Sequence, residues 1–212
     1  MMDNRRSLGP SASGKPVMLC VIGVAAMLLG IILALYATQF PLVPADAATL
    51  TPDEIKDGMG LSIAEAVLLD EYATSGTNGR TDAHHCAVSF GVSGGQTVVA
   101  SLEVPMNGPL FETMWAYLND EDAYFGDCTL TLCATTQSLN EKLAEFLRDY
   151  VKSTFGPLTP YRVAPVSLAM RGETPEAYAA SVSRERNLCL LGGVVLILGG
   201  AAVLIAFFRK RG

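Results

Sequence analysis

The chain has 212 residues, half of them hydrophobic, and its mean hydropathy is positive. This composition is too apolar for an ordinary small soluble domain. The formal net charge is −6, but the segment from Phe40 to Asn187 holds 20 acidic and 9 basic residues, a net charge of −11. An acidic segment excludes a nucleic-acid partner, which needs a basic face, and it disfavours docking on anionic lipid headgroups.

Two uncharged stretches account for the excess of apolar residues. Val17–Ala37 and Leu188–Phe208 contain no charged residue. Each has about the 20 residues that a helix needs to cross ~30 Å of hydrocarbon. A helix buried in a soluble domain seldom lacks a polar face over such a length. The sequence therefore predicts two transmembrane helices, at 17–38 and 188–208.

Basic residues lie at the outer end of each predicted span. They are Arg5, Arg6 and Lys15 before the first span and Arg209, Lys210 and Arg211 after the second. The positive-inside rule then predicts that both termini are cytoplasmic and that the intervening segment lies outside. A signal peptide cleaved near Ala45–Ala48 is the alternative for the first span, but the apolar run exceeds the roughly 7–15 residues of a signal sequence.

Composition divides the chain into seven segments. In order, they are a cytoplasmic tail (1–16), a transmembrane helix (17–38), a linker (39–52), an extracytoplasmic α+β domain (53–170), a juxtamembrane helix (171–187), a second transmembrane helix (188–208) and a cytoplasmic tail (209–212). This organisation predicts a multi-pass protein of the cell membrane.

The outer segment opens with a short helix and continues with strand patterns. Thr51 is an N-cap signal, and Pro52 follows it at the first helical position. Residues 61–72 fit either a strand or a helix. The apolar runs 83–92 and 96–104, joined by a glycine-rich turn, predict a β-hairpin.

Helices and strands alternate in the second half of this segment. Apolar spacing predicts a helix over 110–118 and a strand over 128–135. A longer amphipathic helix over 138–155 begins with a capping box formed by Ser138 and Glu141.

A last strand over 161–168 contains Pro165, which confines it to a sheet edge or a bulge. A helix then restarts at Thr174 and can continue into the second span. The order predicts an α+β fold: two transmembrane helices flanking a mostly antiparallel β-sheet or small barrel with two packed helices. An OB-type barrel has a helix between its third and fourth strands, as here.

Both histidines and three cysteines fall in the predicted strands. Strand alternation places His84 and Cys86 on the apolar face and His85 on an exposed face, so the two histidines cannot converge on one metal. A cluster of His84, Cys86 and Cys128 stays geometrically open, but no zinc-type spacing is present, and we expect no metal or other cofactor. Cys86 and Cys128 are the candidate disulfide pair, with buried free thiols as the alternative. Cys133 is expected to be exposed.

Each predicted span carries a stripe of small residues. These are Gly23, Ala26, Gly30 and Ala34 in the first span and Gly192 and Gly199 in the second. Because lipid supplies no hydrophobic drive between helices, close approach over small residues provides the packing. The stripes predict an antiparallel helical hairpin, and homodimerisation is the competing use of the same faces.

Several short motifs resemble those of a known group of proteins. They are "TPDEIKDGM", Tyr72, "TMWAYLND", "TLTLCATTQSL", "FLRDY" and "PYRV". With them the chain resembles an uncharacterised family of two-pass membrane proteins from Gram-positive, largely gut-dwelling bacteria, whose extracytoplasmic domain has no known function. The resemblance implies no activity. The stretch "AHHCAV" replaces an aromatic-rich strand, which argues against a metal role shared by the family.

The sequence contains no S-x-x-K motif, and no glycine-rich phosphate loop follows a strand. Residues 91–95 match G-x-S-x-G, but they fall in the predicted glycine-rich turn between two strands, whereas the nucleophile motif lies between a strand and a helix. We therefore expect a membrane-anchored extracytoplasmic module with a non-enzymatic binding, sensing or assembly role. The alternative is a membrane-bound enzyme whose site is not recognisable in the sequence. The expected partners are the lipid bilayer and another membrane or cell-surface protein.

Overall fold

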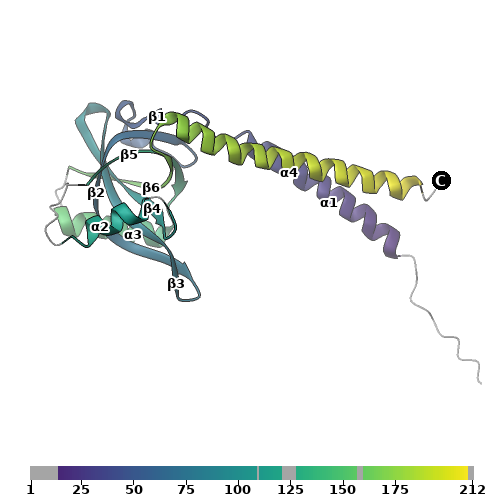
Figure 1. Ribbon diagram of the computed structural model, residues 1–212, viewed down its shortest axis with the longest axis horizontal. Coiled ribbons are helices and arrows are strands. Elements are labelled where there is room, and N and C mark those ends of the chain that lie inside the picture. The colour runs from purple at the N-terminus through teal and green to yellow at the C-terminus, as the bar shows by residue number, and fades with distance from the viewer. Residues whose placement is uncertain (1–13, 109, 121–127, 157–159, 210–212) are drawn as a thin grey trace, which may run out of the picture. The chain divides into compact units, whose positions relative to one another are not determined.

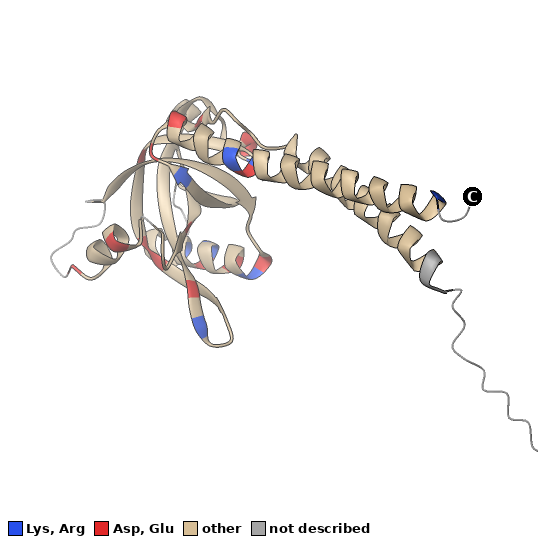
Figure 2. Cartoon of the chain, turned by 45° about the vertical axis from the view of Figure 1, so that its right-hand side comes forward, with Lys and Arg blue, Asp and Glu red and all other residues tan. Residues whose placement is uncertain are grey.

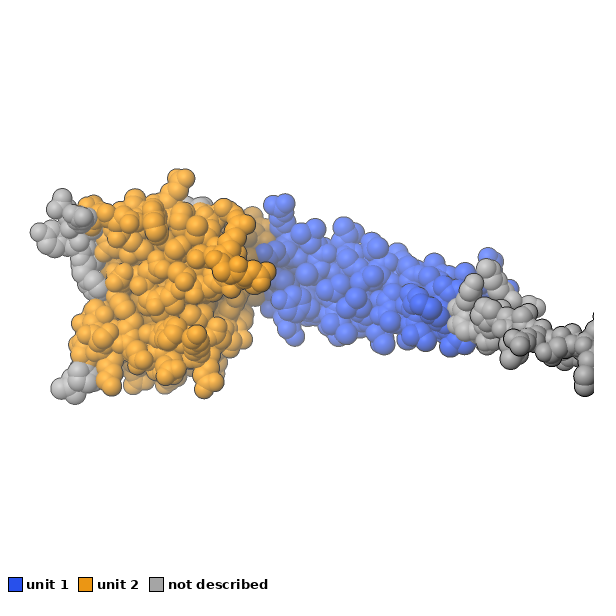
Figure 3. Space-filling model, turned by 90° about the horizontal axis from the view of Figure 1, so that it is seen from below, with its two compact units in different colours: residues 1–40, 184–212 blue, residues 41–183 orange. Residues whose placement is uncertain are grey.

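A computed structural model describes residues 14–108, 110–120, 128–156 and 160–209 (Figure 1). The chain divides into two compact units, coloured separately in Figure 3. One consists of Met1–Phe40 with Arg184–Gly212, and the other is Pro41–Ser183. Most of the basic residues on which the predicted orientation depends lie outside the described residues.

The first unit contains two apolar helices. α1 spans Gly14–Ala37, and α4 spans Pro175–Arg209, of which the part from Arg184 belongs to this unit. Both helices are long and apolar enough to cross a membrane, and α4 carries no charge between Arg186 and Arg209 (Figure 2). Their large side chains are mostly exposed, which distinguishes them from the core helices of a soluble domain.

The two helices of this unit approach each other through glycines. A Cβ added at Gly30 would lie 2.6 Å from the carbonyl oxygen of Gly193, and one added at Gly200 would lie 2.5 Å from that of Gly23. No side chain fits in such a gap, so only glycine allows this separation of the backbones. The contacts pair an early residue of α1 with a late residue of α4, so the helices form an antiparallel hairpin.

The glycines that face α1 are the neighbours of the ones expected from the sequence. A Cβ added at Gly192 would lie 4.0 Å from the end of the Leu33 side chain and would meet nothing nearer. A Cβ added at Gly199 would meet nothing within 4 Å. The expected stripe of α4 is therefore one residue out of phase. Because α4 carries two adjacent glycine pairs seven residues apart, the spacing alone does not identify the contacting pair.

Replacing Gly193 with leucine should destabilise the hairpin, because the new side chain would collide with the backbone of α1 at Gly30. Overpacking of this kind costs about 1–3 kcal/mol. Gly199→Leu is the matched control. It brings the same gain in helix propensity, but its side chain meets no neighbouring atoms. The free energy of unfolding of each variant in detergent checks the prediction, and equal values for the two variants would contradict it.

The second unit is built on a mixed sheet, with six strands among the described residues. The strands are β1 (Ala45–Asp46), β2 (Gly60–Thr77), β3 (Arg80–Val92), β4 (Gln96–Pro105), β5 (Thr129–Ser138) and β6 (Arg162–Gly172). Their order is β1-β2-β3-β4-β6-β5, and β2 also pairs with β5, so the pairing returns to β2. The β1–β2 and β4–β6 pairs are parallel, and the other pairs are antiparallel.

Short helical segments and two α-helices complete this unit. They are η1 (Ala47–Thr49), η2 (Pro52–Glu54), η3 (Ser93–Gly95), α2 (Phe111–Leu118) and α3 (Glu141–Phe155). The ambiguous segment 61–72 is a strand, because it lies within β2 and pairs with β3 on one edge and with β5 on the other. The hairpin between β3 and β4 is confirmed, with η3 as its turn.

Hydrophobic side chains pack on both faces of the sheet. One core lies on the face that carries Leu68, Val88 and Val98, and it includes Met114 of α2. The second core joins residues of the opposite face, including Ala87 and Val99, to Leu147 and Val151 of α3. Alternation along a strand explains why Val98 and Val99 belong to different cores.

One local sequence expectation, the Ser138 capping box, needs correction, and the two alternatives for Pro165 are resolved. The cap of α3 is Asn140, whose side chain accepts a hydrogen bond from the Leu143 amide at 2.9 Å, because Ser138 is still paired with Val166 at the end of β5. β6 is not a sheet edge, since it pairs with both β4 and β5. Pro165 instead lies where the β4–β6 register shifts, which is the bulge alternative.

Candidate functional site

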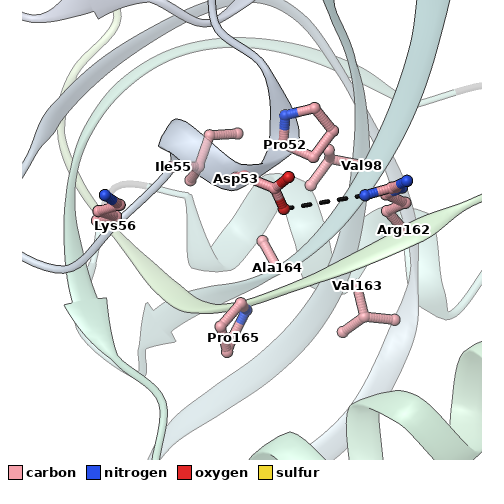
Figure 4. A pocket seen from close by; sticks show the side chains of 9 residues that line it. All are labelled: Pro52, Asp53, Ile55, Lys56, Val98, Arg162, Val163, Ala164 and Pro165. Atoms are coloured by element: carbon pink, nitrogen blue, oxygen red, sulfur yellow. Dashed lines mark ion pairs between the residues drawn. The ribbon is translucent and has the colours of Figure 1, made fainter.

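A groove of about 450 Å³ lies beside η2 and the first half of β6 (Figure 4). Its lining consists of Pro52, Asp53, Ile55, Lys56, Val98, Arg162, Val163, Ala164 and Pro165. Apolar residues form most of the lining, and three charged side chains stand around it. The capping box of η2, in which the Thr51 amide donates to Glu54 at 2.7 Å, fixes the segment that carries Asp53.

The charges of the groove are exposed. Asp53 Oδ1 lies 3.9 Å from Arg162 Nη1, and the two side chains are 91% and 57% exposed. An ion pair in this setting contributes little to stability, about 0–1 kcal/mol at most, so these side chains are available to a ligand. Among the described residues, the polar side chains that line the groove are those of Asp53, Lys56 and Arg162, and their charges suit the binding of a charged group.

His84 lies near the start of β3, beside Glu71, Met106 and two aromatic rings. Its Nδ1 atom is 2.9 Å from Glu71 Oε2, and its Nε2 atom is 3.0 Å from Met106 Sδ. The rings of Phe111 and Trp115, both on α2, have centroids 5.5 and 5.8 Å from the imidazole centroid. His84 is 8% exposed, as expected for the apolar face of the strand.

His85 is buried, so the expectation of an exposed residue is wrong. It is 5% exposed, and its Nε2 atom lies 2.9 Å from Ser75 Oγ. The ring of Tyr72 lies beside it, with centroids 6.4 Å apart. The opposite face of β3 is covered as well, which strand alternation alone does not reveal. Burial lowers the pKa of His85, while the neighbouring Glu103 carboxylate acts to raise it.

The buried His85 should make the domain less stable in acid. Its pKa is lowered on folding, so the unfolded chain binds the extra proton first as the pH falls below about 6.5. Stability is therefore lost between about pH 7 and pH 5. The variant His85→Gln lacks this pH-dependent contribution of His85 to the free energy of unfolding. The stability difference between wild type and variant should therefore shrink as the pH falls. Parallel pH profiles of the two unfolding free energies would contradict this assignment.

All the cysteines are free thiols, so Cys86 and Cys128 follow the free-thiol alternative and not the candidate disulfide. Cys86 is fully buried, and its thiol donates to Met114 Sδ at 3.0 Å. Burial, with smaller contributions from Glu71 and Asp70, raises the pKa of Cys86 to about 12. Cys133 is also buried, against expectation, because β5 is paired along both edges and Ser62 Oγ lies 3.5 Å from its Sγ atom.

Cys128 should be the first thiol outside the two apolar helices to react with a membrane-impermeant maleimide. It is partly exposed, whereas Cys86 and Cys133 are buried. Burial also raises the pKa of Cys128, so the reaction should be slower than that of a free thiol. The measurement uses a chain with Cys20→Ser and Cys189→Ser. Adding Cys128→Ser should remove the fast phase, and an equally fast Cys133 would show that the burial of β5 is wrong.

Comparisons with known proteins add no assignment. No protein-family model matches the chain, and no curated protein or solved structure matches it either. Within the part of the chain that the structure describes, no group of three or more His, Cys, Asp and Glu side chains is placed to hold a metal ion. The contacts of His84 with Glu71 and Met106 were not predicted from the sequence. These residues lie 13 and 22 positions away along the chain, so no local pattern links them to His84.

Proposed function

We propose that this chain is a membrane-anchored binding module. In this proposal α1 and the apolar part of α4 cross the cell membrane, both termini are cytoplasmic, and residues 41–183 lie outside. The helices support it by their length, their lack of charge and the exposure of their large side chains. The glycine contacts between them are of the kind that packs helices in lipid.

We further propose that residues 41–183 form a small closed barrel of the OB type. The pairing order, the parallel pairing of β4 with β6, and the position of α2 between β4 and β5 support this topology. OB-type barrels bind oligonucleotides and oligosaccharides on the face of their second and third strands. The corresponding strands here are β3 and β4, and their residues Ala87 and Val99 are already buried with Leu147 of α3.

A binding role then falls to another part of the domain. The observation that favours it is the groove beside η2, which presents the charged side chains of Asp53, Lys56 and Arg162 around an apolar lining. Such a surface can select a charged partner, and the exposed charges can do so at little cost to stability. The net charge of −11 in the outer segment supports a cationic or protein partner rather than nucleic acid.

Reporter fusions test the proposed topology. A reporter active only outside the cell membrane, inserted at the β2–β3 turn beside Gly79, should be active. The same reporter fused after Gly212 should be silent. The turn suits an insertion, since Asn78 and Gly79 have positive φ values typical of a tight two-residue turn. A reporter restricted to the cytoplasm serves as the reciprocal control. Cytoplasmic activity at the turn would overturn the proposal.

A further inference from the structure

We propose that His84 and Met106 form a binding site for a soft monovalent cation, Cu(I) or its analogue Ag(I). The ligand atoms are the imidazole Nε2 and the thioether sulfur. Thioether sulfur selects Cu(I) over harder cations, and imidazole is a good copper ligand. The proposal goes beyond the anchored binding role and does not depend on the side of a membrane on which the domain lies.

The contact with Glu71 determines which nitrogen of the His84 imidazole carries a proton. Nδ1 lies 2.9 Å from a Glu71 carboxylate oxygen, which is only an acceptor when ionised, so Nδ1 carries a proton. In neutral His84 the other nitrogen, Nε2, then has a lone pair and no proton. That lone pair faces the sulfur of Met106 at 3.0 Å, and a thioether has no proton to donate. Two acceptors directed at each other favour a cation between them.

The neighbouring sulfur pair shows the contrast. Cys86 Sγ lies 3.0 Å from Met114 Sδ, but here the thiol supplies a proton to the thioether. The Cys86–Met114 pair is therefore satisfied within the protein, whereas the His84–Met106 pair is satisfied only by an additional proton or a metal ion.

The groups around the imidazole also suit a metal-bound histidine. A metal-bound histidine usually donates its other N–H group to a carboxylate, which orients the ring and makes it a stronger ligand. Glu71 already occupies this position. Trp115 and Phe111 stack on each other and lie tilted against the imidazole, so they form an apolar wall beside it. An aromatic ring also attracts a cation placed over its face.

Met106 can move to admit a metal ion between the two ligand atoms. Metal–ligand bonds of about 2.0 Å to nitrogen and 2.3 Å to sulfur would require the two ligand atoms to separate by about 1 Å when a metal enters between them. Met106 directly follows the end of β4 and is 38% exposed. Its unbranched side chain has three rotatable bonds and can make this movement. The same exposure places this residue at the surface of the domain.

Intrinsic fluorescence gives a direct test, because Trp115 is the single tryptophan of the chain. The full chain in detergent is titrated with Ag(I), and with Cu(I) in the absence of oxygen and in the presence of a chromophoric competitor. We expect saturable quenching of Trp115 with one metal ion per chain. Absence of saturable quenching with both ions would overturn the proposal.

Variants then identify the ligands. Met106→Leu and His84→Gln should each weaken binding by at least tenfold, and Glu71→Gln should weaken it roughly 10–100-fold, as is typical for the carboxylate partner of a metal-bound histidine. Met170→Leu is the matched control, since Met170 is a partly buried methionine of the same domain, and it should leave the affinity unchanged. All these variants keep the five cysteines. Unchanged affinity in Met106→Leu would assign the metal to thiols and refute the site.

A measurement on the wild-type chain covers the case in which a variant fails to fold. X-ray absorption of the copper-loaded protein should show both an imidazole nitrogen and sulfur in the coordination shell. A shell that contains sulfur alone would place copper on the cysteines and would contradict the assignment of His84.

Discussion

The pairing of β2 with β3 on one edge and with β5 on the other is the constraint on which the domain of residues 41–183 depends. Leu61 and Ile63 pair with Ala134 and Leu132 of β5, and residues from Ala66 onward also pair with β3. This pairing directs one row of β2 side chains into the main core and returns the sheet to its first long strand. Without it β5 would have an unpaired edge, and the first part of β2 would lose its pairing with Ala134 and Leu132.

The same constraint positions both candidate sites. It holds β3 so that His84 lies on the face of the main core, next to the rings of α2, while Ala87 lies under α3. It also holds β6 between β4 and β5, so that Arg162 stands opposite η2 at the groove. The two sites differ in chemistry, since one presents exposed charges and the other pairs two soft ligand atoms beside aromatic rings. The two proposals therefore concern separate surfaces of the domain.

Local patterns in the sequence are sufficient for much of the fold and for little of the site. The length of the two uncharged stretches identifies the apolar helices. The alternation of apolar and polar residues identifies the β3–β4 hairpin. Alternation gives the correct face of His84 but not the burial of His85 and Cys133, because it is silent on what covers the second face of a strand. The contact between His84 and Met106 joins positions 22 residues apart in sequence, and it depends on the register of β3 with β4, which no local pattern specifies.

Backbone hydrogen exchange in the full chain tests the β2–β5 pairing most directly. At its two ends the Leu68 amide donates to the Cys128 carbonyl at 2.9 Å, and the Thr136 amide donates to the Met59 carbonyl at 2.8 Å. Since both bonds break only when the two strands separate, these amides should exchange as slowly as the core amide of Val88 in β3. Rapid exchange of Leu68 and Thr136 beside a protected Val88 would show that β2 and β5 are not joined, and it would contradict the account.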